Sequence, residues 1–308
     1  MVRHQFPPPL RQGIALAVLV LCPTLAMAAE IAVVADLRIR PYVEALAGFK
    51  EVTHGTIHVY ENQEDGSLED EHRLAERIRE RNPGVILAIG QEALHGVVSK
   101  NSDIITVFAM AYPSAAISQK TNLTGITLES DPVQLADVLD QLFPGPMRVG
   151  TIYDPNTSEQ LVSATRAALD KHGKTLDAAP ITGSESPVEQ AKAILNGVDA
   201  FWMVPDQTIH DPDVVRFLLF ASRKQGKPLI GPSGKYVKAG ALLALTPDSH
   251  GIGREAAELA DRLLAGTPVR DLPIRPTSHT TLFIHKTIAA EQGIVVPESL
   301  KQKVRYVP

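Results

Sequence analysis

The sequence predicts an α/β protein made of two doubly wound, parallel-sheet lobes joined by a multi-strand hinge. Short apolar runs rich in Val, Ile, Leu and Ala alternate along the chain with longer amphipathic segments. Several of these runs are continuous, which is typical of parallel strands covered on both faces. The β-α-β-α order requires right-handed crossover connections. Ten strands would be near the upper limit for one twisted open sheet, so two sheets are favoured.

Ten segments of the chain have the composition of such strands. They are Ile31–Asp36, Ile57–Tyr60, Val85–Gly90, Ile104–Met110, Leu123–Leu128, Arg148–Tyr153, Thr175–Pro180, Val198–Val204, Pro228–Gly231 and Ala241–Thr246. Two further pieces near the C-terminus, Val237–Ala241 and Gly293–Pro297, are also expected to be buried strands that end in small or polar turns.

The amphipathic segments between the strands carry signals for helix ends. Asp131-Pro132 and Asp211-Pro212 each combine a capping side chain with proline at the first helical position. Glycines close several of these segments, as helix C-termini commonly require. Helices are therefore expected at Arg40–Val52, Asp70–Arg81, Asp131–Leu142, Ser158–His172, Pro187–Leu195, Gly253–Leu264 and from Asp211 to Gly226.

The N-terminus has the organisation of a secretory signal peptide. A basic start precedes the apolar run Gly13–Leu21, which is too short to span a bilayer comfortably. Ala26-Met27-Ala28 then supplies the small residues of a cleavage site. Residues 1–28 are therefore expected to be removed, leaving a periplasmic protein that does not span the membrane. An uncleaved anchor is the alternative for this segment.

Composition limits what the mature chain can do. Cleavage would remove Cys22, the only cysteine, which excludes disulfides, thiolate catalysis and Cys-ligated metal. It would also remove Arg3 and Arg11, so the formal charge would change from −5 to −7. This mild acidity argues against nucleic-acid partners and against electrostatic binding to membranes.

The boundary between the lobes is expected at Leu128–Pro132, where a strand gives way to a capped helix. The late strand Ala241–Thr246 is expected to return the chain to the first lobe, and Ile274–Ile284 to cross again. Lobe one would then hold residues 29–129 and 246–273, and lobe two residues 130–245 and 274–308. Multiple crossings of this kind make a hinge with a cleft between the lobes.

The order and spacing of several segments are similar to those of the ABC-transporter substrate-binding proteins of the tryptophan/tyrosine type. The segments include Arg148–Asn156, Val198–Asp206, Lys227–Ser233, Gly253–Ala260 and Gly293–Pro297. The resemblance covers most of the chain after the signal peptide. It implies a type I periplasmic-binding fold, a ligand between the lobes, and a membrane permease with a cytoplasmic ATPase as partner.

Three loop positions depart from the pattern of that family. Ala111–Ser114 stands where the family usually has Asp-Pro, and Pro247–His250 stands where it usually has an aromatic residue. His285 replaces a common asparagine. Because these positions would face the cleft or hinge, the aromatic amino acid ligand of the family does not carry over to this chain.

Ligands of open α/β sheets bind at the carboxyl ends of strands, and Tyr153 and Asp206 end two strands of the second lobe. Asp206 could hold a ligand ammonium, and Tyr153 could supply an apolar face and a hydroxyl. The alternative for Asp206 is a cap on the following turn. Six further residues occupy comparable strand ends, as turn residues or as ligand contacts: Asp36, Gln91, Met110, Tyr112, Ser233 and Asp248.

No arrangement of residues indicates catalysis, a cofactor or a metal, so the chain is not expected to be an enzyme. Gly251–Ala256 matches a dinucleotide fingerprint only loosely, and a helix start explains it better. The acidic stretch Glu61–His72 is expected to be a solvated helix start, with a metal site as the alternative. Trp202, the only tryptophan, lies inside a strand, which favours core packing over ligand stacking.

The sequence therefore predicts a monomeric, exported solute-binding protein of an ABC importer. Its ligand would be a small organic solute, amino-acid-like in chemistry, bound between the lobes. A periplasmic sensor or accessory binding module of the same fold is the alternative, because one fold serves several binding roles.

Overall fold

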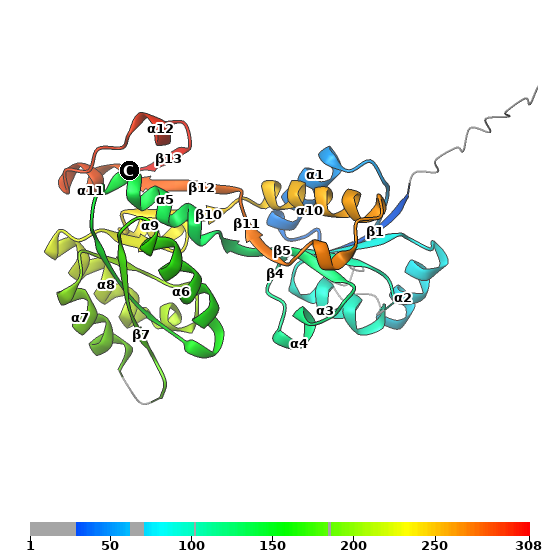
Figure 1. Cartoon of the computed structure of the whole chain (residues 1–308), viewed down its shortest axis with the longest axis horizontal. Coiled ribbons are helices and arrows are strands. Elements are labelled where there is room, and N and C mark those ends of the chain that lie inside the picture. The colour runs from blue at the N-terminus through cyan, green and yellow to red at the C-terminus, as the bar shows by residue number, and fades with distance from the viewer. Residues whose placement is uncertain (1–28, 62–70, 102, 184–185) are drawn as a thin grey trace, which may run out of the picture.

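The computed structural model describes residues 29–61, 71–101, 103–183 and 186–308. The expected signal peptide, residues 1–28, lies outside these ranges, as does most of the acidic stretch Glu61–His72. Figure 1 shows two α/β bodies placed along the long axis of the molecule and joined by strands. We call them lobe 1 and lobe 2 in chain order.

Lobe 1 contains a six-stranded, parallel sheet of order β11-β5-β4-β3-β1-β2. Its strands are β1 (Glu30–Ala35), β2 (Thr56–Glu61), β3 (Val85–Ile89), β4 (Thr106–Ala111), β5 (Leu123–Ser130) and β11 (Arg275–Thr277). Its helices are α1 (Arg40–Val52), α2 (Glu71–Glu80), α3 (Gln91–Lys100), α4 (Ala115–Ser118) and α10 (Ser249–Leu264), with the 3-10 turn η2 (Val269–Asp271).

Lobe 2 contains a seven-stranded sheet of order β13-β12-β10-β9-β8-β6-β7. Only the β10–β12 pair is antiparallel. Its strands are β6 (Arg148–Tyr153), β7 (Thr175–Pro180), β8 (Ala200–Trp202), β9 (Leu229–Gly231), β10 (Leu243–Pro247), β12 (Thr280–His285) and β13 (Val304–Val307). Its helices are α5 (Pro132–Leu142), α6 (Pro155–Asp170), α7 (Pro187–Gly197), α8 (Pro212–Gln225), α9 (Gly234–Ala239), α11 (Lys286–Glu291) and α12 (Glu298–Lys301), with the 3-10 turn η1 (Gln207–His210).

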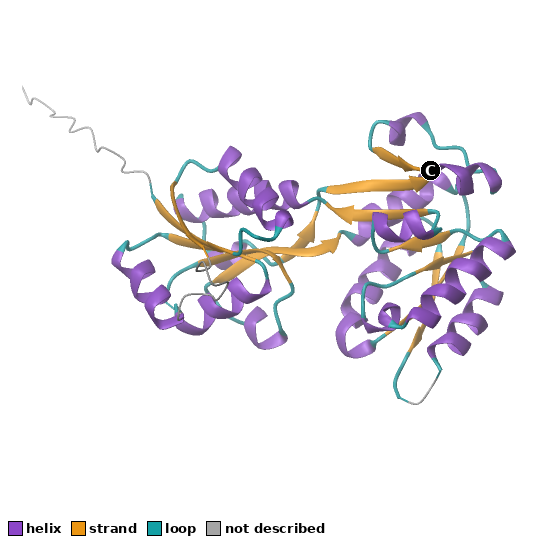
Figure 2. Cartoon of the chain, turned by 180° about the vertical axis from the view of Figure 1, so that it is seen from behind, coloured by secondary structure: helices purple, strands orange, loops and turns teal. Residues whose placement is uncertain are grey.

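Both faces of each sheet are buried, which explains the continuous apolar runs in the sequence. Along β1, Ile31 and Val33 enter one core cluster, whereas Ala32 and Val34 enter another on the opposite face. In lobe 2, Trp202 and Phe201 divide in the same way between two clusters. Figure 2 shows the helices covering the strands on both sides. The predicted fold class, two doubly wound lobes, is confirmed.

The chain passes between the lobes three times. The passages lie between β5 and α5, between β10 and α10, and between β11 and β12. The division expected from the sequence changes lobe after residue 273, whereas β11 pairs with β5 of lobe 1. β11 is only three residues long, Arg-Pro-Thr, so no apolar run marked it as a strand.

Two segments that were expected to be strands have other structures. Val237–Ala239 ends helix α9, in which the buried positions Gly234 and Val237 are three residues apart, as a helix requires and a strand does not. Gly293–Pro297 is an irregular connection after α11. Val295 is 81% exposed there, and Ile294 and Val296 pack against the main core of lobe 2.

Helix α10 crosses α1 so closely that glycine is required on both helices. A Cβ atom added at Gly253 would lie 1.8 Å from the carbonyl oxygen of Ala45. A Cβ atom added at Gly48 would lie 2.0 Å from the carbonyl oxygen of His250. Both obstacles are backbone atoms, so a side chain at either position would force the helices apart.

We expect Gly253→Ala to lower the free energy of unfolding by about 3 kcal/mol, because overpacking a rigid helix contact is destabilising. The matched control is Gly197→Ala at the end of α7, where an added Cβ meets nothing within 4 Å. That variant should be neutral or slightly more stable. Urea denaturation of both variants measures the difference, and equal midpoints would contradict the close contact.

Glu255 on α10 is 2% exposed and anchors the passage from β11 to β12. Its carboxylate accepts hydrogen bonds from the Ser278 backbone N–H at 2.8 Å and from the Ser278 hydroxyl at 2.6 Å. The Thr277 hydroxyl donates to it at 3.2 Å, and the Arg275 guanidinium pairs with it. The side chain therefore fixes one of the three inter-lobe connections to lobe 1.

We expect Glu255→Gln to lower the free energy of unfolding by about 2 kcal/mol, because it weakens charge-assisted hydrogen bonds and leaves a half-exposed guanidinium without its carboxylate. Glu258→Gln is the control, since Glu258 lies on the same helix and is exposed. It should change stability by less than about 0.5 kcal/mol. Chemical denaturation compares the two; a neutral Glu255→Gln would show that the carboxylate is dispensable.

Candidate functional site

A cavity of about 270 Å³ lies at the junction of the two lobes. Lobe 2 contributes the carboxyl ends of three strands. They are Trp202 from β8, Ile230–Ser233 at the end of β9 and just beyond it, and Leu245–Pro247 from β10. Leu161 and Thr165 of α6 and the start of α5 complete its wall. Lobe 1 contributes Tyr112 and the end of β5, Leu128–Ser130. The position follows the rule that open α/β sheets bind ligands at the carboxyl ends of their strands.

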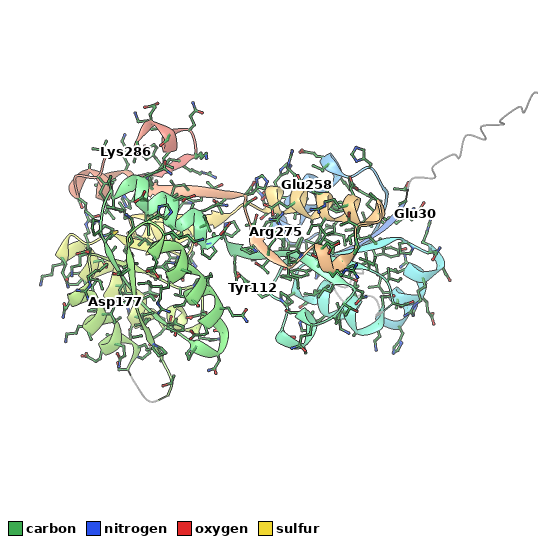
Figure 3. All side chains as sticks on the ribbon, in the orientation of Figure 1. Glu30, Tyr112, Asp177, Glu258, Arg275 and Lys286 are labelled. Carbon is green, nitrogen blue, oxygen red and sulfur yellow. The ribbon has the colours of Figure 1, made fainter. Side chains whose placement is uncertain are left out.

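Tyr112 is directed to this junction by an irregularity at the end of β4. The register between β4 and β5 shifts between Ala109 and Ala111, and Met110 has a φ of 61°. Such a bulge changes the direction of the side chains that follow it. The Tyr112 backbone N–H then donates to Gln91 Oε1 at 2.9 Å, and its hydroxyl donates to the Leu128 carbonyl at 2.9 Å. Figure 3 shows Tyr112 between the lobes.

Glu129 is the one acidic side chain among the described residues that line the cavity. The Thr127 hydroxyl lies 3.5 Å from its Oε2 atom, at the limit of a hydrogen bond. Burial raises the pKa of Glu129 above its ordinary value, an effect that the Thr127 hydroxyl partly offsets. Loss of water around the Tyr112 hydroxyl, together with the charge of Glu129, raises the pKa of Tyr112.

Four short polar side chains share the cavity with Glu129: Ser130, Thr165, Ser233 and Thr246. Thr165 donates its hydroxyl to the Leu161 carbonyl within α6 at 2.8 Å. Ser130 donates its hydroxyl to the Leu245 carbonyl at 3.1 Å and so ties β5 to β10. Thr246 accepts from the Gly234 backbone N–H at 3.0 Å. The Ser233 hydroxyl makes no hydrogen bond within the described part of the chain, so it is free to meet a ligand.

Of the eight site residues expected from the sequence, Tyr112 and Ser233 line this cavity, and the other six do not. Gln91 acts on the cavity indirectly, by holding the backbone of Tyr112. Met110 is 6% exposed and belongs to a core cluster of lobe 1.

Asp206 and Tyr153 already use their polar atoms within lobe 2. Asp206 accepts from the Thr208 N–H and hydroxyl at 2.8 and 2.6 Å, and from the Asp154 N–H at 2.8 Å. Asp206 thus caps η1, the alternative role that its sequence position offered. The Tyr153 hydroxyl donates to Glu159 at 2.7 Å, which raises the pKa of Tyr153.

The two remaining aspartates, Asp36 and Asp248, bind groups that lie two or three residues away in the chain. Asp36 receives the backbone N–H and guanidinium of Arg38, which lower the pKa of its carboxyl. Asp248 caps α10 by accepting from the Gly251 N–H at 3.1 Å.

Most cavity residues were not among the expected ligand contacts, and two of them, Trp202 and Glu129, matter most to the site. Trp202 is 6% exposed and packs in the core of lobe 2, as its strand position predicted, but it also lines the cavity. Glu129 follows the apolar run Leu123–Leu128, so the strand-end rule that selected Asp206 applies to it equally. The sequence analysis placed the boundary between the lobes at Leu128–Pro132, and most of the same residues line the cavity.

The sequence profile of ABC transporter substrate binding proteins matches residues 43–307. The chain belongs to this family. The predicted resemblance is therefore confirmed, and the chain is a substrate-binding component of an ABC transporter, not an enzyme. No curated protein matches the sequence.

Solved structures share the fold of this binding protein at low identity. The ABC domain from Streptococcus pneumoniae in complex with L-Trp is 19% identical, with a TM-score of 0.54; the match covers 91% of this chain and 100% of that one. A ligand-free, open substrate binding protein with adhesive properties from Clostridium difficile is 16% identical, with a TM-score of 0.68; coverage is 91% and 99%. A conserved domain protein from Vibrio cholerae is 21% identical, with a TM-score of 0.55; coverage is 91% and 100%.

Within the described ranges, the binding protein has no helix with the length and apolar character needed to cross a bilayer. The same residues include no group of three or more His, Cys, Asp or Glu side chains placed to hold a metal ion.

The raised pKa of Glu129 predicts how its replacement changes stability with pH. Below the unfolded-state pKa the carboxyl is protonated in both states, so Glu129→Gln should match the wild type. As pH rises through the folded-state pKa, the wild type must hold a partly desolvated charge, so the variant should become the more stable of the two. Thermal unfolding from pH 4 to pH 8 measures this. The exposed Glu258→Gln should show no such trend, and a variant that loses stability as pH rises would contradict the burial of Glu129.

Proposed function

We propose that this chain is the exported solute-binding protein of an ABC importer and that it binds a small organic solute in the cavity between its lobes. The observation that carries the proposal is the shared lining of this cavity. Tyr112 and Glu129 come from lobe 1, and Trp202 and Ser233 come from lobe 2. A solute held by both lobes stabilises whichever arrangement brings them together, which is the basis of hinge closure around ligands.

The composition of the lining suits a solute with an apolar body. Leucine, isoleucine, proline, tyrosine and tryptophan side chains make up most of the wall, and a few polar groups are placed among them. Sites of this kind gain affinity from apolar burial and orientation from their few polar contacts. An amino-acid-like solute would also need a carboxylate for its ammonium, and Glu129 is available for that role whereas Asp206 is occupied.

The proposed route of the protein follows from the sequence of its first 28 residues. Export with cleavage before Ala29 would place the mature monomer in the periplasm. There it would deliver its solute to a permease driven by a cytoplasmic ATPase, with no bond made or broken. Mass spectrometry of the protein from a periplasmic extract tests the cleavage site directly.

Solute binding can be measured with residues 29–308 after unfolding and refolding to strip any co-purified ligand. We expect one class in a panel of amino acids, amines and organic acids to raise Tm, since a ligand at 100 times its Kd adds about 2.7 kcal/mol of stability. The fluorescence of Trp202, the only tryptophan, should change with the same concentration dependence. A folded, ligand-free protein that responds to no member of a broad panel would contradict the proposal.

Tyr112→Ala should weaken binding about tenfold or more, because it removes the aromatic wall contributed by lobe 1. Tyr112 is 46% exposed, so the loss should not unfold the protein. Phe220→Ala is the matched control, since Phe220 is 70% exposed on α8 and lies outside the cavity lining. Calorimetric titration compares the two variants, and equal affinities would remove Tyr112 from the site.

A further inference from the structure

The half-buried carboxylate of Glu129 differs from the paired, fully buried charges of this protein. Lys174 is fully buried, and it is bound by Asp140 at 2.9 Å and by the carbonyls of Phe143 and Gly145. Glu255 is paired with Arg275 and receives three further hydrogen bonds. Glu129 has no Lys, Arg or His within ion-pair distance anywhere in the described ranges, and its single contact is the long one from Thr127.

An unpaired carboxylate in an apolar cavity is unfavourable until a cation reaches it. Nothing else that lines this cavity in the described chain carries a formal charge. The cation must therefore come from the solute. The other atoms of the solute would meet side chains such as Tyr112, Trp202 and Leu161, so the body of the solute must be apolar.

The same lining argues against a zwitterion. A free amino acid would bring a carboxylate into the cavity together with its ammonium, and no basic side chain of the described lining could receive it. Arg38, at the carboxyl end of β1 in lobe 1, is already bound by both oxygens of Asp36. A solute carboxylate would thus be desolvated without a counter-charge, close to the negative charge of Glu129.

The geometry points to a monocationic solute: a protonated amine on an aromatic or branched aliphatic body, with no carboxylate, held by Glu129 through a charge-assisted hydrogen bond. This assignment rests on the proposed function, because it names the class of solute for the same cavity. It places the polar anchor on β5, a strand whose end meets both lobes, while the apolar wall belongs mostly to lobe 2.

Three compounds with one body isolate the contribution of each charge: 2-phenylethylamine, phenylalanine and 3-phenylpropionate. Isopentylamine, leucine and 4-methylpentanoate repeat the comparison with an aliphatic body. Calorimetric titration of ligand-free residues 29–308 at neutral pH should show at least one amine binding tenfold or more tightly than its amino acid. Neither acid should bind.

Variants of Glu129 test its role separately from the solute panel. Glu129→Gln should weaken amine binding at least tenfold, whereas Glu129→Asp keeps the carboxylate and should keep the preference for amines at reduced affinity. Glu258→Gln removes an exposed carboxylate from α10 that does not line the cavity and lies apart from Tyr112 in Figure 3, so it should leave binding unchanged. Circular dichroism confirms that each variant is folded before titration.

The outcomes distinguish this inference from the function on which it rests. If the amino acids bind more tightly than the amines, the monocation assignment is overturned and the solute-binding function stands. If amines bind equally well to wild type and Glu129→Gln, Glu129 is not the anchor. If a folded protein binds no member of either set and no member of the broader panel, the proposed function falls as well.

Discussion

The bridge built on Glu255 is the interaction on which the arrangement of the two lobes depends. Glu255 belongs to α10 of lobe 1 and binds Ser278, in the connection from β11 to β12. The Ser278 carbonyl in turn accepts from Gln134 Nε2 on α5 of lobe 2, and Gln134 Oε1 accepts from Thr280. One short chain of hydrogen bonds therefore joins a helix of each lobe through a hinge segment. Because its central carboxylate is buried and paired, this chain of hydrogen bonds holds the passage from β11 to β12 to lobe 1; the other two passages follow β5 and β10.

Those two passages also border the cavity. Leu128–Ser130 ends β5 and Leu245–Pro247 ends β10, and the Ser130 hydroxyl ties one to the other. The residues that would contact a solute from the hinge side are thus residues whose backbone must move when the lobes change position. A ligand bound there can bias the hinge directly, with no need for coupling through the cores.

The fold was predictable from the sequence because burial on both faces leaves a strong pattern. Runs such as Val85–Ile89 contain no polar residue, and caps such as Asp131-Pro132 mark helix starts without tertiary information. The errors arose where the pattern is short. Val237 is the one fully buried apolar side chain of the small helix α9, and Gly293–Pro297 packs against a core without pairing as a strand.

The site was less predictable, because strand-end position selects a region and not a side chain. Asp206 and Glu129 both come after apolar runs in the sequence, but Asp206 turns back to Thr208, whereas Glu129 lies on β5 at the junction of the lobes. That difference depends on which strand continues to the other lobe. The role of Gln91 was equally hidden, since it acts through the backbone of Tyr112 and a bulge at Met110.

The discontinuous construction of lobe 1 has a consequence for the order in which the chain folds. Helix α10 packs against helix α1, and the Thr53 hydroxyl after α1 donates to Asp261 of α10, 208 residues further along the chain. Contacts of such long range form late, after closure of a very large loop. Most of lobe 2, by contrast, comes from the continuous stretch between α5 and β10. Lobe 1 therefore cannot complete its core until α10 and β11 have been made, and the edge strands β12 and β13 of lobe 2 follow later still.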